Sequence, residues 1–225
     1  MIRVVLVDDQ AVVRAGFKVI LESEGDITVV GEASGGRESL VVIRNTQPDV
    51  VVMDVRMPGG NGIDATRAIV SQGGGDPEHP PPSVLVVTTF DLDEHVFGAL
   101  EAGASGFVLK DTEPEELIGA VRALASGHGA IDSATTRRVI AEFARRHAST
   151  PPKPNDLTPR ESDIVRLLGD GLSNEEIGAR LYIETSTVKS HLTRVMGKLG
   201  TRDRLQTVVW AYQTGLLPIP TEEKS

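Results

Sequence analysis

Five polar residues in the first half of the chain stand where chemistry could occur, because each lies at the end of a short apolar run. They are Asp8, Asp9, Asp54, Thr88 and Lys110. Asp54 is the clearest case: the apolar run 50–53 ends on it, and the letters RMPGGNG that follow indicate a turn. A carboxylate there could be a nucleophile, and a metal ion, a hydroxyl and an ammonium group could together hold a phosphoryl group.

These residues can meet only if the chain folds into a parallel sheet. Short β-branched runs predict five strands, at 3–7, 27–33, 50–53, 83–88 and 106–110. The amphipathic segments between them are typical of helices. The alternation predicts an α/β, flavodoxin-like, doubly wound five-stranded parallel sheet. With the strand order 2-1-3-4-5, the carboxyl ends of the strands bring all five polar residues to one rim.

Three carboxylates at one rim repel each other and raise each other's pKa. A hard divalent cation removes that conflict, and Mg²⁺ prefers a few carboxylates together with waters. The rim is therefore expected to bind Mg²⁺ through Asp8, Asp9 and Asp54.

Two other functions could use the same rim. One is an aspartate-nucleophile phosphatase of the haloacid-dehalogenase type, which would have a second acid two residues after the nucleophile. This chain has Arg56 there. The other is a flavodoxin-like FMN-binding domain, which would have a phosphate-binding loop after the first strand. This chain has DDQ there, which would repel phosphate.

The starts of several helices can be read from capping residues. The spacing of an N-terminal cap occurs in the pairs Thr112–Glu115, Asp91–Glu94, Thr158–Glu161 and Ser173–Glu176. Two of these pairs, Thr158–Glu161 and Ser173–Glu176, form the full pattern of a capping box, and both lie in the last third of the chain.

Composition restricts the class of protein. The 225 residues, 40% hydrophobic and 24% charged, are typical of a soluble globular protein. The absence of cysteine excludes disulfides and thiolate metal sites. No apolar run approaches the ~18 residues of a membrane-spanning helix. We therefore expect a cytoplasmic protein that does not engage a membrane.

The net charge of −9 is unevenly distributed along the chain. Residues 1–125 contain 20 acidic and 9 basic side chains, whereas residues 156–216 contain eight of each. Between them, residues 134–147 have a helical pattern, and the Pro-rich letters STPPKPN predict an extended linker. We predict two domains with different partners, at 1–125 and 156–216, joined by the linker 126–155 and followed by a tail at 217–225.

The second domain is predicted to be a small all-α unit of four helices, two of them joined by a short turn as in a helix-turn-helix. The second helix of that pair would bury Val188, Leu192, Val195 and Leu199. Its other face would present Thr187, Lys189, Ser190, Thr193 and Arg194. Short polar and basic side chains near a helix N-terminus suit the major groove of DNA. On charge alone, a helical bundle with solvated charges is an open alternative.

Residues 1–125 resemble the receiver domain of two-component response regulators. The motifs that carry the resemblance are DD at 8–9, MDVRMPGGNG at 53–62, VTTF at 87–90 and GFVLK at 106–110. The resemblance implies that Asp54 is the phospho-acceptor. It also implies that Asp8 and Asp9 bind Mg²⁺ together with Asp54 and the backbone carbonyl of Arg56.

The same resemblance assigns roles to three further residues. Thr88 and Lys110 would contact the phosphoryl group. Phe107 would be the aromatic residue that turns inward when Thr88 moves. The Gly/Pro-rich segment 73–82, predicted to be a surface loop, departs from the usual receiver pattern but would lie away from the site.

Residues 157–216 resemble the LuxR-type helix-turn-helix, through the segments LTPRE, SNEEIGARL, TVKSHL and KLG. With both domains, the chain resembles NarL/FixJ-type response regulators. The implied protein is a transcription factor and not an enzyme. A histidine kinase would phosphorylate it, the phosphorylated chains would form a homodimer, and double-stranded DNA would be bound by the exposed face described above. We expect Lys198 to add a contact with a DNA phosphate.

Overall fold

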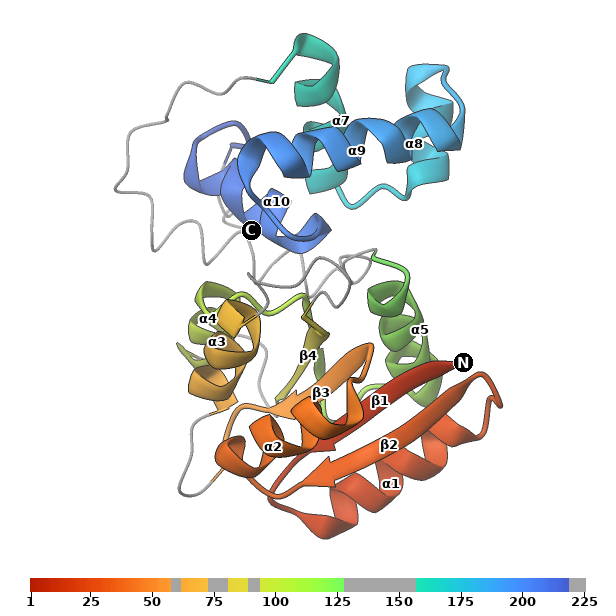
Figure 1. Ribbon diagram of the computed structural model, residues 1–225. Helices are drawn as coiled ribbons and strands as arrows, with labels where there is room; N and C mark the ends of the chain where they lie inside the picture. The colour runs from red at the N-terminus through yellow and green to blue at the C-terminus, as the bar shows by residue number, and fades with distance from the viewer. Residues whose placement is uncertain (58–61, 73–80, 89–93, 128–156, 219–225) are drawn as a thin grey trace, which may run out of the picture. The chain divides into compact units, whose positions relative to one another are not determined.

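The computed structural model describes residues 1–57, 62–72, 81–88, 94–127 and 157–218 (Figure 1). The chain divides into two compact units, Met1–Gly129 and Ala130–Ser225. The predicted helix at 134–147, most of the predicted loop at 73–82 and the cap residue Asp91 lie outside the described residues. Within the described part, no helix is both long and apolar enough to cross a membrane.

The first unit contains the predicted parallel sheet, and its strand order β2-β1-β3-β4-β5 is confirmed. The strands are β1 (Ile2–Val7), β2 (Ile27–Ala33), β3 (Val50–Asp54), β4 (Ser83–Thr88) and β5 (Gly106–Leu109). All neighbouring pairs are parallel. Their bounds lie within about a residue of the predicted ones, because long β-branched runs leave few other structures open.

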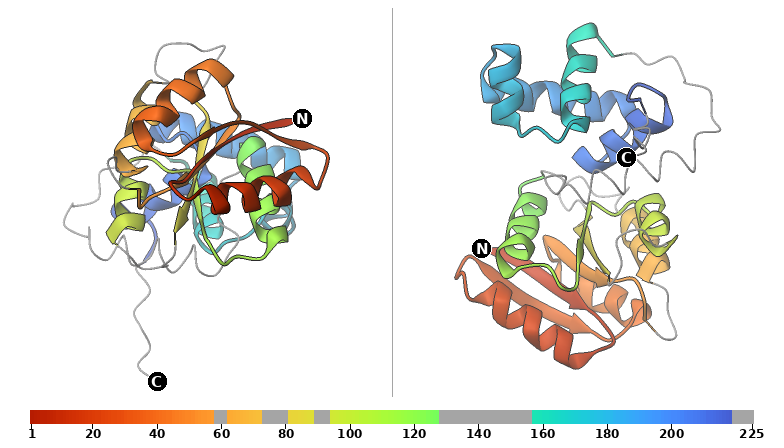
Figure 2. Two further views of the ribbon diagram at one scale, coloured as in Figure 1. Left: turned by 90° about the horizontal axis from the view of Figure 1, so that it is seen from below. Right: turned by 180° about the vertical axis from the view of Figure 1, so that it is seen from behind.

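Helices cover both faces of this sheet. They are α1 (Ala11–Glu22), α2 (Gly36–Thr46), α3 (Gly62–Gln72), α4 (Glu94–Glu101) and α5 (Pro114–Ala125). Figures 1 and 2 show α1 and α5 on one face and α2, α3 and α4 on the other. With both faces covered, the central strands are almost entirely apolar: Val50–Met53 is buried, and Asp54 is the one charged residue of β3.

The predicted cap at Thr112 is wrong. Helix α5 begins at Pro114, with Glu113 at the N-cap position and no side-chain cap bond. The Thr112 hydroxyl instead donates to Glu116 Oε2 at 2.5 Å. Proline determines this start, because it lacks an N–H and its fixed φ suits the first position of a helix.

The second unit is the predicted four-helix arrangement in its described part. Its helices are α7 (Pro159–Gly169), α8 (Asn174–Leu181), α9 (Thr185–Leu199) and α10 (Arg204–Gln213). Both predicted capping boxes are confirmed, at Thr158 with Glu161 and at Ser173 with Glu176. The core consists of apolar side chains from all four helices, among them Ile164, Leu168, Ile177, Val188 and Leu205.

The turn between α8 and α9 depends on a glycine. The N–H of Ile183 donates to the carbonyl of Gly178 at 2.9 Å, which folds the turn back onto α8. A Cβ at Gly178 would lie 2.7 Å from the Ile183 oxygen, so only glycine permits this approach. Tyr182 ends α8 in the left-handed conformation, and the chain reverses into α9.

Candidate functional site

The carboxyl ends of β1, β3 and β5 bring two aspartates and a lysine into contact. Lys110 Nζ donates to Asp8 Oδ2 at 2.7 Å and to Asp54 Oδ2 at 2.8 Å. The other oxygen of Asp54 accepts the backbone N–H of Arg56 at 3.0 Å. Asp8 and Asp54 are only 3% and 4% exposed, so both carboxylates depend on protein partners instead of water.

Burial sets the electrostatics of this contact. Desolvation raises the pKa of the Asp54 carboxyl, against the opposing effect of the hydrogen bond from Lys110. For Lys110, desolvation lowers the pKa, but the hydrogen bonds to Asp54 and Asp8 outweigh it and the net pKa is raised. The ammonium group therefore stays charged, beside a carboxylate that is more basic than usual. A basic, partly desolvated carboxylate is suited to attack an electrophile.

A third carboxylate completes an acidic cluster. One oxygen each of Asp8, Asp9 and Asp54 lie within 4.8 Å of one another. Asp9 Oδ1 is buried and has no hydrogen-bond partner among the described residues. A buried oxygen without a partner is costly in a protein unless an ion or water satisfies it. These oxygen donors fit a hard divalent cation such as Mg²⁺.

Thr88 lies on β4, the strand next to that of Asp54, and Phe107 lies on β5, one strand further away. Val87 is the register partner of Asp54, so Thr88 extends one residue beyond it at the same edge of the sheet. The backbone N–H of Lys110 donates to the Thr88 carbonyl at 2.7 Å, which keeps these two residues adjacent. Phe107 is 4% exposed, so its ring is buried.

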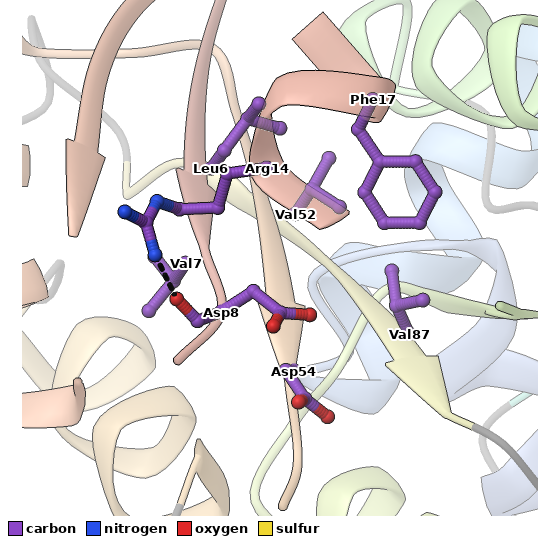
Figure 3. A pocket seen from close by; sticks show the side chains of 8 residues that line it. All are labelled: Leu6, Val7, Asp8, Arg14, Phe17, Val52, Asp54 and Val87. Carbon is purple, nitrogen blue, oxygen red and sulfur yellow. Dashed lines mark hydrogen bonds between the residues drawn. The ribbon is translucent and has the colours of Figure 1, made fainter. Parts of the chain in front are cut away.

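Two residues that sequence reasoning did not single out also shape the site. Gly62, the first residue of α3, approaches Asp54 so closely that a Cβ there would lie 2.1 Å from the Asp54 carbonyl oxygen. Arg14 reaches back from α1 and donates to the Asp8 carbonyl at 2.7 Å (Figure 3). The glycine-rich turn hinted at Gly62, but no spacing rule points to Arg14.

The second unit presents the predicted exposed face on α9. Val188, Leu192 and Val195 are buried as predicted, but Leu199, the last residue of α9, is only partly buried. The five side chains on the outer face, Thr187, Lys189, Ser190, Thr193 and Arg194, are exposed. The Ser190 and Thr193 hydroxyls donate to the carbonyls of Ser186 and Lys189, each at 3.0 Å. Their hydrogens point into the helix, so these hydroxyls offer lone pairs outward.

Lys198 differs from these five residues, because it already has an acidic partner. Its Nζ lies 2.7 Å from Glu161 Oε2, the same oxygen that accepts the backbone N–H of Thr158 in the capping box. The hydrogen bond from Lys198 is the main cause that lowers the Glu161 pKa to about 2. Lys198 thus joins the C-terminal half of α9 to the start of α7.

Comparisons with known proteins match both units. A family model described as the response regulator receiver domain matches residues 4–122. A second model, described as bacterial regulatory proteins of the luxR family, matches residues 155–211. These matches favour a response regulator over a phosphatase or an FMN-binding domain.

Similar proteins include the transcriptional regulatory proteins YxjL and LiaR of Bacillus subtilis. YxjL is 40% identical over 96% of this chain and 97% of its own length. LiaR is 38% identical over 96% of this chain and its full length. Among solved structures, the response regulator ChrA of a heme-sensing two-component system is 40% identical. It covers 96% of this chain and 98% of its own, with a TM-score of 0.51.

Proposed function

Because the chain belongs to the DNA-binding response regulators of two-component systems, with a receiver domain and a LuxR-type domain, we propose that Asp54 accepts its phosphoryl group. The observation that carries this proposal is the contact of Lys110 with both Asp54 and Asp8. It provides a buried carboxylate with an ammonium group already beside it. That ammonium group can stabilise the negative charge of the phosphoryl oxygens during transfer.

The donor is the phosphohistidine of a cognate histidine kinase. The phosphorus–nitrogen bond to the histidine breaks as a bond forms between phosphorus and an Asp54 carboxylate oxygen. Lys110 and the Thr88 hydroxyl hold the phosphoryl oxygens, and Phe107 responds to the position of Thr88. Mg²⁺, when bound, neutralises charge on the carboxylates and the phosphoryl group. Asp8, Asp9, Asp54 and the carbonyl of Arg56 would hold the ion.

The output is binding to double-stranded DNA through α9. Lys189 and Arg194 supply positive charge, and the hydroxyls of Thr187, Ser190 and Thr193 supply polar contacts in the major groove. Phosphorylated chains act as a homodimer, so two α9 helices reach two half-sites. We place the protein in the cytoplasm, acting as a regulator and not as an enzyme.

The direct test is phosphorylation of the full chain by a small phosphodonor in the presence of Mg²⁺. Asp54→Asn should abolish labelling, because it removes the nucleophilic oxygen while keeping the size of the side chain. The matched control is Asp64→Asn on α3, whose exposed carboxylate pairs with Arg67. The control should be labelled like the wild type. Full labelling of Asp54→Asn would refute the assignment.

A further inference from the structure

Arg14 connects the acidic cluster to a second acid outside it. The residue lies in the first turns of α1, and its side chain is only 16% exposed. Its Nη1 donates to the backbone carbonyl of Asp8 at 2.7 Å. Its Nε lies 3.2 Å from Glu32 Oε2 near the end of β2. One planar guanidinium thus bridges the end of β1 and the end of β2, with both donors in fixed directions.

Asp8 is held by four separate contacts. Its N–H donates to the Ala33 carbonyl at 3.2 Å. Its carboxylate accepts the Gln10 N–H at 2.8 Å and Lys110 Nζ at 2.7 Å. The contact with Arg14 is the one made to the carbonyl, so it occupies neither carboxylate oxygen. A cation bound by the Asp8 carboxylate would therefore leave the bond from Arg14 intact (Figure 3).

The positive charge of Arg14 and its hydrogen bond to Asp8 should change the affinity of the site for Mg²⁺ in opposite directions. As a cation next to the acidic cluster, Arg14 repels another cation, so its removal should tighten Mg²⁺ binding. As a clamp on the Asp8 backbone, it keeps a ligand in place, so its removal should weaken Mg²⁺ binding. Outer groups that orient metal ligands typically change metal affinity by about 10–100-fold. Glu32 partly neutralises the guanidinium, which reduces the repulsion and favours the second effect.

We propose that Arg14 is a positioning residue for the Mg²⁺ site: by clamping the Asp8 carbonyl, it orients the Asp8 carboxylate toward the cation. The proposal rests on the proposed function, because it takes Asp8 as a Mg²⁺ ligand. Arg14 itself touches neither the cation nor the phosphoryl group.

Three variants of the full chain separate the effects of geometry and charge. Arg14→Gln removes both the charge and the guanidinium. Arg14→Lys keeps the charge but cannot place two fixed donors on Asp8 and Glu32. Lys18→Gln is the matched control: Lys18 lies one turn further along α1 and 3.6 Å from the same Glu32, but among the described residues it forms no hydrogen bond or ion pair with Asp8.

Two measurements are made on each variant. Calorimetric titration with MgCl₂ gives the Mg²⁺ dissociation constant, and thermal unfolding in EDTA gives the stability of the fold without metal. We expect both Arg14 variants to bind Mg²⁺ about tenfold more weakly or worse. Lys18→Gln should match the wild type. At saturating Mg²⁺, both Arg14 variants should recover labelling by a small phosphodonor, because Asp54 and Lys110 are unchanged.

The outcomes distinguish this inference from the proposed function. If the wild type bound no Mg²⁺, the proposed metal site itself would be wrong. If the wild type bound Mg²⁺ and Arg14→Lys bound it equally well or more tightly, only the positioning role would be refuted. Lower stability in EDTA with an unchanged Mg²⁺ dissociation constant would also refute it, since Arg14 would then support only the fold.

Discussion

Lys189 is the residue whose surroundings best suit reading a base. It lies on the outer face of α9, near the helix N-terminus, and is exposed. Its ammonium group has no acidic partner in the described part of the chain. A lysine in this situation can reach guanine or a phosphate without first breaking an ion pair.

We predict that Lys189→Ala weakens binding to a DNA site selected from random sequences. The loss should be ~1–3 kcal/mol if Lys189 contacts a base, and it should depend on the sequence of the site. Arg166→Ala is the control, because Arg166 lies on α7 and pairs with Asp163. Fluorescence anisotropy gives both affinities, and circular dichroism checks the fold. Equal affinities for the wild type and Lys189→Ala would remove Lys189 from the DNA interface.

The ion pair of Lys198 is a contact that the sequence did not predict. Its exposed position on a basic helix predicted a contact with phosphate, and that role remains a prediction. The structure adds its ion pair with Glu161, which lies 37 residues earlier in the chain. A pairing over that separation depends on how α7 and α9 pack, and no local spacing rule reports it. The DNA contact of Lys198 would therefore compete with a bond inside the unit.

The start of α7 combines a capping box with an ion pair. Glu161 is 3% exposed and accepts both the Thr158 N–H and Lys198 Nζ. These bonds hold its pKa at about 2, below the ordinary 4.5. Because the folded state depresses this pKa, the stabilisation is present above pH 4.5 and is lost as the pH falls toward about 2.

We predict that Glu161→Gln destabilises the second unit by about 1–2 kcal/mol at pH 7. The difference from the wild type should shrink as the pH falls from 4.5 toward 2, because glutamine does not titrate. Urea unfolding can be followed by the fluorescence of Trp210, the single tryptophan of the chain. Glu176→Gln is the control, since Glu176 has the same capping-box position in α8. A loss that did not change with pH would contradict the assigned ion pair.

The start of α3 is constrained by its close contact with the end of β3. A Cβ at Gly62 would lie 2.1 Å from the backbone carbonyl oxygen of Asp54, so Gly62→Ala must move either α3 or the end of β3. We expect a loss of about 1–3 kcal/mol in stability and slower labelling of Asp54. Gly119→Ala in α5 is the control, because a Cβ there meets nothing within 4 Å. It should be neutral or stabilising by up to about 1 kcal/mol. Calorimetry measures the stability of both variants. If Gly62→Ala were as stable as the wild type, the close approach of Gly62 to Asp54 would be contradicted.

The elements were the most predictable level of this protein. Strand order and both capping boxes follow from rules that act over a few residues or from the topology of parallel sheets. The polar rim was predictable for the same reason, because strand ends must meet. The predicted cap at Thr112 was wrong because Pro114 favours the first position of the helix, which places the helix start after Thr112. The contacts of Arg14 with Asp8 and of Gly62 with Asp54 could not be predicted, because they exist only once α1 and α3 are packed on the sheet.

At the scale of the whole molecule, the two units differ in net charge. Residues 1–125 contain 20 acidic and 9 basic side chains, an excess that would repel DNA. Residues 156–216 contain eight acidic and eight basic side chains, so the attraction of this domain to DNA depends on the few cations of α9. The electrostatic attraction of a single chain to DNA is therefore weak, and tight DNA binding should require more than one chain.

We predict that the phosphorylated protein binds DNA with two chains per site. Two linked α9 helices add their contacts at high effective concentration, which can raise affinity by about 10²–10⁴ over one helix. The half-site centres should lie roughly one helical turn apart, so that both helices enter the groove on one side of the duplex. Sedimentation of the labelled protein with a selected DNA site gives the stoichiometry, and Asp54→Asn treated with the same phosphodonor is the control. The control should bind weakly and without cooperativity, because it cannot be phosphorylated. A single chain bound tightly by the phosphorylated protein would show that α9 alone supplies the affinity.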